Sequence, residues 1–420
     1  MGDRVLIRLR RTWRMAPFTA YLLAVTGWFF SFGLQTTLFP GVLSYTLNES
    51  PDRLGMAQAA LTAPMLLILP LAGVVAERLD RRAVMAGFHL LAAAGAAGLA
   101  VLLFNDQLSY SILVAYALVV GAAGAFVMPA RDSAVNPVTK VAQRMGRPQF
   151  TLQRAVVIAS LVQFAAQIAG MAAGYLAGRF GPGLLFAVQA AGLIIGGAAA
   201  LVMPRLHARR RIYIPVLRSL REGVKTVLSS SVLLPMTLIM LAVGFFVVGG
   251  GFFVIVPVLV RDGYDGGYGL LSGLMIAFWV GAFVANVMLA RHGAVDRPGQ
   301  ALMAAQMVTV ISMGALALPL PLAALGVLVF LWGLGGGVAI SLSRAVVQEQ
   351  APPAQIARVM SVYQLGLFGG MPAGAFFMGH MVDALGPRTA ALIPMAGLLI
   401  VLCAIALLTP ILKVRRVDPG

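Results

Sequence analysis

Long apolar stretches alternate with short polar breaks along almost the whole chain. A window of about 20 apolar residues is long enough to cross the hydrocarbon core of a bilayer as a helix. Such windows predict twelve transmembrane helices, at 17–45, 53–76, 83–104, 108–130, 150–177, 183–203, 232–260, 267–290, 299–319, 322–343, 355–382 and 388–411. The longer windows are expected to tilt or bend.

Two polar breaks organise this pattern. The first, Gly73–Arg82, reads Gly-Val-Val-Ala-Glu-Arg-Leu-Asp-Arg-Arg and predicts a charged hairpin between two membrane helices. The second, 205–231, is the longest polar stretch and has six windows on each side. It predicts a basic cytoplasmic linker with an amphipathic helix on the membrane surface, or a mere spacer. We therefore expect an N-terminal bundle at 1–204 and a C-terminal bundle at 232–420.

The two halves resemble each other weakly. Gly174–Pro182 and Gly379–Pro387 both follow the fifth window of their half and share the spacing Gly-x6-Gly-Pro. Arg131 near the end of the fourth window has a counterpart in Arg344 near the end of the tenth. This predicts two pseudo-symmetric six-helix bundles.

Composition narrows the class of protein. Hydrophobic residues make up 60% of the chain and charged residues 11%, against about 25% charged in soluble proteins. We therefore expect an all-α membrane protein.

The Lys and Arg residues that give the net charge of +17 are predicted to lie mostly on one side of the membrane. With the N-terminus in the cytoplasm, only Arg53, Arg179, Arg261 and Arg388 of the 31 Lys and Arg fall outside, as the positive-inside rule requires. Both termini are then cytoplasmic, and the basic surface faces anionic lipid rather than nucleic acid. Arg far outnumbers Lys, which favours a bacterial inner membrane.

The charged hairpin resembles the loop signature of the major facilitator superfamily, Gly-x-Leu-Ala-Asp-Arg-x-Gly-Arg-Arg. The matching residues are Gly73, Ala76, Arg78, Arg81 and Arg82, while Val75, Glu77 and Asp80 replace Leu, Asp and Gly. Further segments resemble the drug/proton antiporter branch, which includes macrolide efflux and enterobactin exporters: Ser31-x-Gly33-x-Gln35, Ser50–Gly55, Pro64, Pro129–Arg131 and Arg358–Ser361.

This resemblance implies a cytoplasmic gate. Glu77 is then expected near Ala354–Arg358, and Arg81 to pair with Asp132, which would hold the cytoplasmic side closed. The implied gate residues are Gly73, Glu77, Arg78, Asp80, Arg81, Arg82 and Asp132. The alternative is a solvated loop that only sets topology.

Ionisable side chains avoid the middle of the windows. No Asp, Glu, Lys or His lies in the central part of any window, although 83–104 holds one His. Intramembrane charges are costly and usually functional, so we expect a neutral, amphipathic or lipophilic cargo. Proton-coupling candidates lie nearer the helix ends: Asp132, Glu349, His380 and Asp383. His380 and Asp383 alone are too few to hold a metal.

Neutral polar and aromatic residues do enter the windows. The resemblance places windows 1, 4, 7 and 10 around the cargo cavity, and three consecutive glycines, Gly249–Gly251, weaken window 7. Cavity candidates are Ser31, Gln35, Phe245, Phe246, Phe252, Phe253, Asn286, Ser341 and Gln364. The alternatives are helix–helix contacts for the polar residues and lipid contacts for the phenylalanines.

Small residues in the fifth and eleventh windows predict close helix packing. Gly170 and Gly174 occupy the place of the antiporter signature Gly-Pro-x-x-x-Gly without its proline, whereas Pro372 and Gly374 keep a similar element.

The leading interpretation is a monomeric secondary transporter that works by rocker-switch alternating access and exports a small amphipathic compound in exchange for protons. Multidrug, siderophore or metabolite efflux all fit. The alternatives are an importer or facilitator of a neutral solute, or a membrane sensor or scaffold. An enzyme is not expected, because no nucleophile–base set, metal cluster or phosphate loop is recognisable. No cofactor is expected, and the proton gradient would supply the energy.

Overall fold

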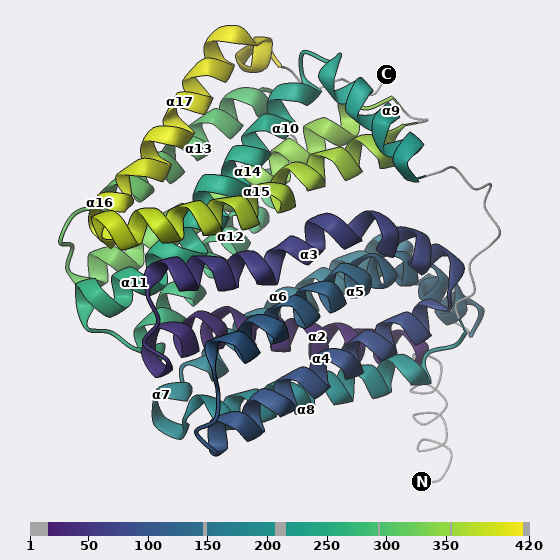
Figure 1. The fold of residues 1–420 in the computed structure, drawn as a ribbon. Helices are drawn as coiled ribbons and strands as arrows, with labels where there is room; N and C mark the ends of the chain where they lie inside the picture. Colours follow the sequence, from purple (N-terminus) through teal and green to yellow (C-terminus); the bar gives the residue numbers. More distant parts are fainter. Residues whose placement is uncertain (1–15, 146–148, 206–215, 293–294, 353–354, 415–420) are drawn as a thin grey trace. The chain divides into compact units, whose positions relative to one another are not determined.

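The computed structural model describes residues 16–145, 149–205, 216–292, 295–352 and 355–414. Within these ranges the chain is helical and contains no strand, so the expected all-α fold is confirmed. Figure 1 shows long helices throughout both halves of the sequence. The hydrophobic pattern explains this result, because a backbone in lipid must satisfy its own hydrogen bonds and a helix does so within one segment.

Each predicted membrane helix of the first half is present. They are α2 (Ala16–Gly41) continued by the π-helical η1 (Val42–Thr46), α3 (Pro51–Arg78), α4 (Arg81–Phe104), α5 (Tyr110–Arg144), α6 (Leu152–Gly174) with the short α7 (Ala177–Phe180), and α8 (Pro182–Val202). The helix α5 runs 14 residues beyond the predicted end at 130, because polar residues continue the helix past the apolar window.

The second half follows the same order after the linker helix α9 (Val216–Leu228). The helices are α10 (Leu233–Ala242), π-helical η2 (Val243–Ile255), α11 (Val256–Val258), η3 (Leu259–Gly263), α12 (Tyr268–His292), α13 (Pro298–Ala315), α14 (Leu322–Gln350), α15 (Ile356–Leu385), α16 (Pro387–Ala390), α17 (Leu392–Leu408) and the short η4 (Pro410–Lys413). Among the described residues, ten helices are long and apolar enough to cross a membrane. The other two predicted spans, 53–76 and 299–319, coincide with α3 and α13.

The internal repeat is visible in the backbone. Gly181 and Gly386 have φ angles of 80° and 75°, and each directly precedes a proline that begins the next helix. A positive φ is costly for other residues, so the same tight turn recurs at equivalent places of the two halves.

The contacts divide the chain into two compact units. Unit 1 comprises 1–38 and 67–212, and unit 2 comprises 39–66 and 213–420. In unit 1, α4 packs against α8 and α5. In unit 2, the main contacts are α12 with α14, α15 with η2, and α13 with α14. The last residues of the first membrane helix, 39–46, and the first part of α3, 51–66, thus belong with the later helices, while the predicted bundles 1–204 and 232–420 stay a prediction.

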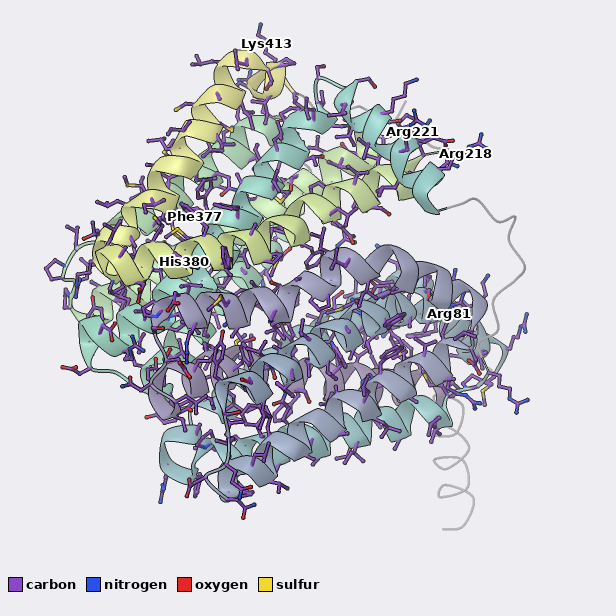
Figure 2. The ribbon with its side chains drawn as sticks, in the orientation of Figure 1. Arg81, Arg218, Arg221, Phe377, His380 and Lys413 are labelled. Carbon is purple, nitrogen blue, oxygen red and sulfur yellow. The ribbon has the colours of Figure 1, made fainter. Side chains whose placement is uncertain are left out.

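The predicted amphipathic helix of the linker is α9. Thr226 donates to Gln355 Oε1 at 2.5 Å, and Glu222 pairs with Arg358 at the start of α15. Away from α15, α9 exposes Arg221 and Lys225. Arg218 is also exposed and pairs with Glu222 one turn later at 3.1 Å, and Figure 2 shows Arg218 and Arg221 on the outer side of α9. One face of α9 is therefore fixed to α15, and the other is basic.

Candidate functional site

The charged hairpin begins α4 with a helix cap. Asp80 accepts a hydrogen bond from the backbone N–H of Arg82 at 3.1 Å, which satisfies one of the unpaired donors at a helix start. Asp80 stands where the family signature has Gly, and the cap explains how a carboxylate serves at this turn. Arg82 donates to the carbonyls of Leu201 and Met203 at 3.2 and 3.3 Å and so fixes the end of α8.

The two members of the predicted latch lie on different helices, Arg81 on α4 and Asp132 on α5, and each has another polar neighbour. Arg81 Nε donates to Ser133 Oγ at 2.9 Å, and Asp132 Oδ1 accepts from Arg131 at 2.6 Å. Asp132 is 65% exposed. The latch itself stays a prediction. The side chains of Gly73, Glu77 and Arg78, and residue Ala354, lie outside the described residues.

Arg131 is the residue that sequence reasoning underrated. Its guanidinium donates to Gln163 Oε1 on α6 at 2.7 Å and lies 4.7 Å from the ring centre of Phe29 on α2. The side chain is only 15% exposed. Arg131 on α5 therefore contacts both α2 and α6. The sequence feature that indicates this role is an arginine at the end of a predicted membrane helix, with a glutamine in the next one.

A buried group of polar side chains surrounds Gln35. Tyr116 and Gln189 both donate to Gln35 Oε1, at 2.5 and 2.8 Å, and Ser31 donates to the carbonyl of Gln189 at 3.2 Å. Gln35 and Gln189 also line a cavity of about 30 Å³ together with Trp28. Gln35 Nε2, Gln189 Oε1 and Trp28 Nε1 are buried without a partner among the described residues. The structure thus brings Ser31 and Gln35 together inside unit 1.

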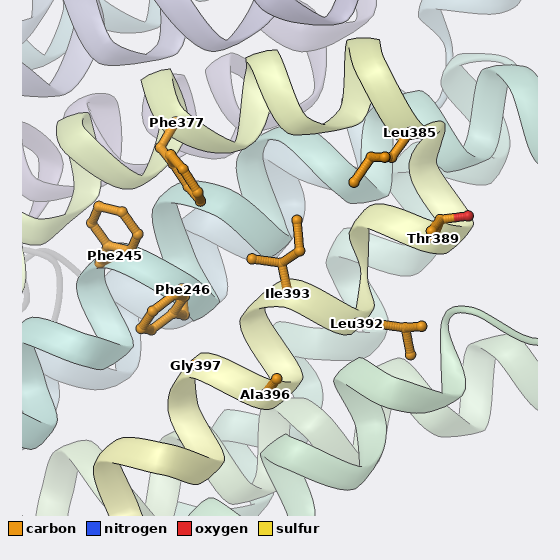
Figure 3. Close-up of a pocket in the computed structure, with 9 residues that line it drawn as sticks. All are labelled: Phe245, Phe246, Phe377, Leu385, Thr389, Leu392, Ile393, Ala396 and Gly397. Atoms are coloured by element: carbon orange, nitrogen blue, oxygen red, sulfur yellow. The ribbon is translucent and has the colours of Figure 1, made fainter.

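The phenylalanine candidates of η2 lie in different surroundings within unit 2. Phe245 and Phe246 line an open apolar groove of about 600 Å³ with Phe377, between η2, α15 and the start of α17. Figure 3 shows their rings converging on Ile393. Phe252 is instead 4% exposed and packs on Phe278 and Trp332, with ring centres 4.6 and 6.0 Å away.

The remaining cavity candidates lie elsewhere in the fold. Phe253 is half-buried and contacts Phe252 edge-on. Ser341 donates to Asn286 Oδ1 at 2.6 Å, and Asn286 donates to the carbonyl of Ala282. This pair links α14 to α12, as interhelical amides do in membranes. Gln364 is half-buried on α15.

The proton-coupling candidates are exposed. Glu349 lies near the end of α14, and Asp383 and His380 lie on α15. Figure 2 shows His380 and Phe377 on the same helix. The hydroxyl of Ser50 donates to Asp52, and this hydrogen bond, with a further contribution from the positive charge of His380, holds the pKa of Asp52 below its usual value. Asp52 directly precedes the predicted span 53–76, so His380 has an acidic neighbour other than Asp383.

Glycines set the closest helix contacts. A Cβ on Gly170 of α6 would overlap the carbonyl oxygen of Phe30 on α2, and a Cβ on Gly374 of α15 would overlap that of Phe245 on η2. Gly174 and Pro372 are also buried on these two helices. The helices can therefore approach to backbone contact, as small residues allow in membranes.

A buried histidine lies inside a predicted membrane helix, α4. His89 is fully buried on α4, with Nδ1 2.7 Å from the carbonyl oxygen of Met85 and Nε2 3.1 Å from that of Ala24. The indole of Trp28 lies 5.1 Å from the imidazole, centre to centre. His89 is the one histidine of the predicted window 83–104 and was not among the proton-coupling candidates.

Comparisons with known proteins agree with this architecture. The crystal structure of a mutant of the nucleoside transporter NupG aligns with a TM-score of 0.76 and 14% identity, over 93% of this chain and 99% of that one. A bacterial homologue of the human lysosomal transporter Spinster, in an inward-facing and unoccupied conformation, aligns with a TM-score of 0.64 and 15% identity, over 97% of this chain and 99% of that one. At these identities the likeness shows the fold alone.

No curated protein matches the chain by sequence. The model of the family described as transmembrane secretion effector matches residues 16–418. That family and the major facilitator neighbours indicate a membrane transporter rather than an enzyme. Long apolar helices in a repeated order, the charged hairpin and a match over nearly the whole length lead to one conclusion: the chain belongs to the transmembrane secretion effector family and has the major facilitator superfamily fold.

Proposed function

We propose that this secondary transporter exports a small amphipathic or lipophilic compound in exchange for protons, by rocker-switch alternating access. Protons would move down their gradient into the cell as cargo moves out. The proposal includes a bacterial inner membrane location, both termini in the cytoplasm, a monomer, and no cofactor other than the proton gradient. The exposed basic face of α9, with Arg218 and Arg221, supports contact with anionic lipid on the cytoplasmic side.

The apolar groove is the observation that supports an amphipathic or lipophilic cargo. Its volume of about 600 Å³ matches that of sites for drug-sized ligands. Its lining is apolar apart from Thr389, and Phe377, Leu385 and Leu392 at its rim are 37%, 48% and 41% exposed. In a bilayer such a surface is open to compounds dissolved in the hydrocarbon. A polar sugar would find almost no hydrogen-bonding group there.

A second candidate function is the uptake or facilitated movement of a neutral polar solute. The observation that favours it is the buried group around Gln35, where an amide donor and an amide acceptor remain unpaired beside a cavity. Such a donor–acceptor set suits an amide-like edge of a solute.

A transport assay separates the two functions. Purified protein in proteoliposomes with an imposed pH gradient is given lipophilic dyes, antibiotics and nucleosides. Gradient-driven movement of dyes or antibiotics that a protonophore abolishes supports the export proposal. Movement of nucleosides alone, or movement that ignores the gradient, contradicts it and favours the second candidate.

Filling the groove tests the cargo site. Ala396 is exposed on the groove side of α17, and Ala396→Phe is expected to lower dye transport about tenfold by occupying the apolar volume. The matched control is Leu407→Phe, at a position 83% exposed on the same helix and outside the groove. Equal dye transport by the two variants would remove the groove from the cargo path.

A further inference from the structure

His89 is held between two backbone carbonyl oxygens. Nδ1 faces the carbonyl of Met85, one turn earlier on α4, and Nε2 faces the carbonyl of Ala24 on α2. Both distances, 2.7 and 3.1 Å, are those of hydrogen bonds. The imidazole is thus positioned to donate on both sides.

A neutral imidazole cannot make both hydrogen bonds. It carries one N–H, so either tautomer leaves a nitrogen lone pair facing a carbonyl lone pair, whereas the imidazolium donates from both nitrogens. If Nδ1 keeps its proton for the shorter bond to Met85, deprotonation breaks the bond to Ala24. The charge state of His89 therefore decides whether the hydrogen bond from α4 to the carbonyl of Ala24 on α2 is present.

An aromatic ring and small residues surround the imidazole. The indole of Trp28 packs against it with ring centres 5.1 Å apart and planes 62° apart, a distance at which a cation–π contact forms. On α8, Gly196 and Gly197 make room for the ring: a Cβ on Gly196 would lie 2.9 Å from Cδ2 of His89. No ionisable residue occurs on α8.

The other packed helices do not place a carboxylate on His89. The one ionisable residue of α2 is Tyr21, whose hydroxyl donates to the carbonyl of Arg131. Arg81 and Arg82 lie two turns away at the start of α4. On α5, Tyr116 donates to Gln35. Among the described residues, the two carbonyls are the hydrogen-bond partners of His89, so a proton there is not already neutralised by an acid.

The polar cavity of unit 1 lies next to the neighbour of His89, Trp28. Trp28 contacts His89 and also lines the cavity of about 30 Å³ at Gln35 and Gln189. That volume admits a water, and the unpaired polar atoms of Trp28, Gln35 and Gln189 are the partners a buried water needs.

We propose that His89 is the proton-binding site of this transporter, where one proton from water converts the imidazole to an imidazolium that bridges Ala24 and Met85, and leaves to water on the other side. This rests on the proposed proton-coupled function. The four exposed candidates, Asp132, Glu349, His380 and Asp383, then serve other roles.

The first test observes the proton directly and needs no cargo. The full chain, with ¹⁵N-labelled histidine, is reconstituted in liposomes, and solid-state NMR follows the imidazole nitrogens between about pH 5 and pH 8. The signal that disappears in His89→Gln is expected to change from two protonated nitrogens to one as the pH rises. His380→Gln, at an exposed histidine of α15, should leave that signal in place. A His89 signal that stays neutral at every pH overturns the proposal.

A variant that keeps the histidine guards against misfolding of His89→Gln. Trp28→Phe retains an aromatic ring but gives a weaker cation–π contact, so the His89 midpoint is expected to fall. An unchanged midpoint would contradict the proposed role of the indole in holding the charge.

The second test separates this inference from the proposed function. In the dye assay, His89→Gln is expected to lose gradient-driven accumulation at least about tenfold while downhill exchange of dye continues, and His380→Gln should keep both. Full gradient-driven transport by His89→Gln overturns the inference and leaves the proposed function standing. Gradient-insensitive wild-type transport contradicts the proposed function, and the NMR titration still decides whether His89 binds a proton.

Discussion

At the scale of residues, the charged positions around α5 differ in burial and so in what they can contribute. Arg131 is largely buried and contacts α2 and α6, whereas Asp132 is 65% exposed and its ion pair with Arg131 is open to solvent. Exposed ion pairs contribute about 0 to 1 kcal/mol to stability. A role for Asp132 must therefore appear in transport rather than in folding.

Asp132→Asn and Ser133→Ala distinguish two ways of holding Arg81. We expect Asp132→Asn to reduce dye transport several-fold with unchanged expression, because a gate that pairs Arg81 with Asp132 in one state of the cycle would lose its anion. Ser133→Ala removes the observed acceptor of Arg81 and is the matched comparison. Reduced transport in Ser133→Ala alone would assign the contact to Ser133 and end the Asp132 latch.

At the scale of elements, glycine decides how η2 meets α15. The sequence predicts a weak helix from Gly249–Gly251, and the structure has a π-helical segment at Val243–Ile255. Widening of the helical turn leaves Phe245 and Phe246 beside the apolar groove and turns Phe252 into the core. Segments of this kind recur at functional sites.

Gly374→Ala tests the contact between η2 and α15. The added methyl would overlap the carbonyl oxygen of Phe245, a backbone atom that cannot rotate away, so we expect a loss of about 1 to 3 kcal/mol. The measurement is the melting midpoint in detergent. Gly326→Ala on α14 is the control, because a Cβ there meets no atom within 4 Å, and its midpoint should stay equal or rise slightly. A fall of the same size in both variants would refute the packing argument.

At the scale of the whole molecule, charge and apolar length describe how the chain lies in the membrane. The helices coincide with the predicted windows, and the Lys and Arg residues gather at alternate helix ends. Because translocating Lys and Arg is unfavourable, this asymmetry predicts orientation. The orientation itself stays a prediction.

Cysteine labelling tests that orientation. The single Cys403 is replaced by Ser, and one new cysteine is placed either at Gln107, exposed between α4 and α5, or at Lys225, exposed on α9. In intact cells a membrane-impermeant maleimide is expected to label Gln107→Cys and not Lys225→Cys. The reverse pattern would invert the topology and with it the assigned direction of export.

The sequence predicts many of the residues of the candidate site, but it does not predict which of them contact each other. Ser31 and Gln35 stand four apart on one helix face, which indicates a shared environment. Their partners Tyr116 and Gln189 come from two other helices and carry no local signal. Likewise, Asn286 and Ser341 were separate candidates that the fold makes one pair. Phe245 and Phe252 look equivalent in sequence, yet one lines a groove and the other is core, because helix rotation at η2 depends on packing against α15.

The sequence by itself determined the class of this protein, the positions of its helices and its repeat, because apolar length and glycine–proline turns act within one segment and need no neighbour. Only the tertiary structure decided which polar groups meet. Asp80 became a helix cap, Arg131 a three-helix contact, and His89 a ring held between carbonyls of two helices. Hydrogen bonds act over about 3 Å, so residues 65 positions apart, such as Ala24 and His89, interact only after the helices have packed.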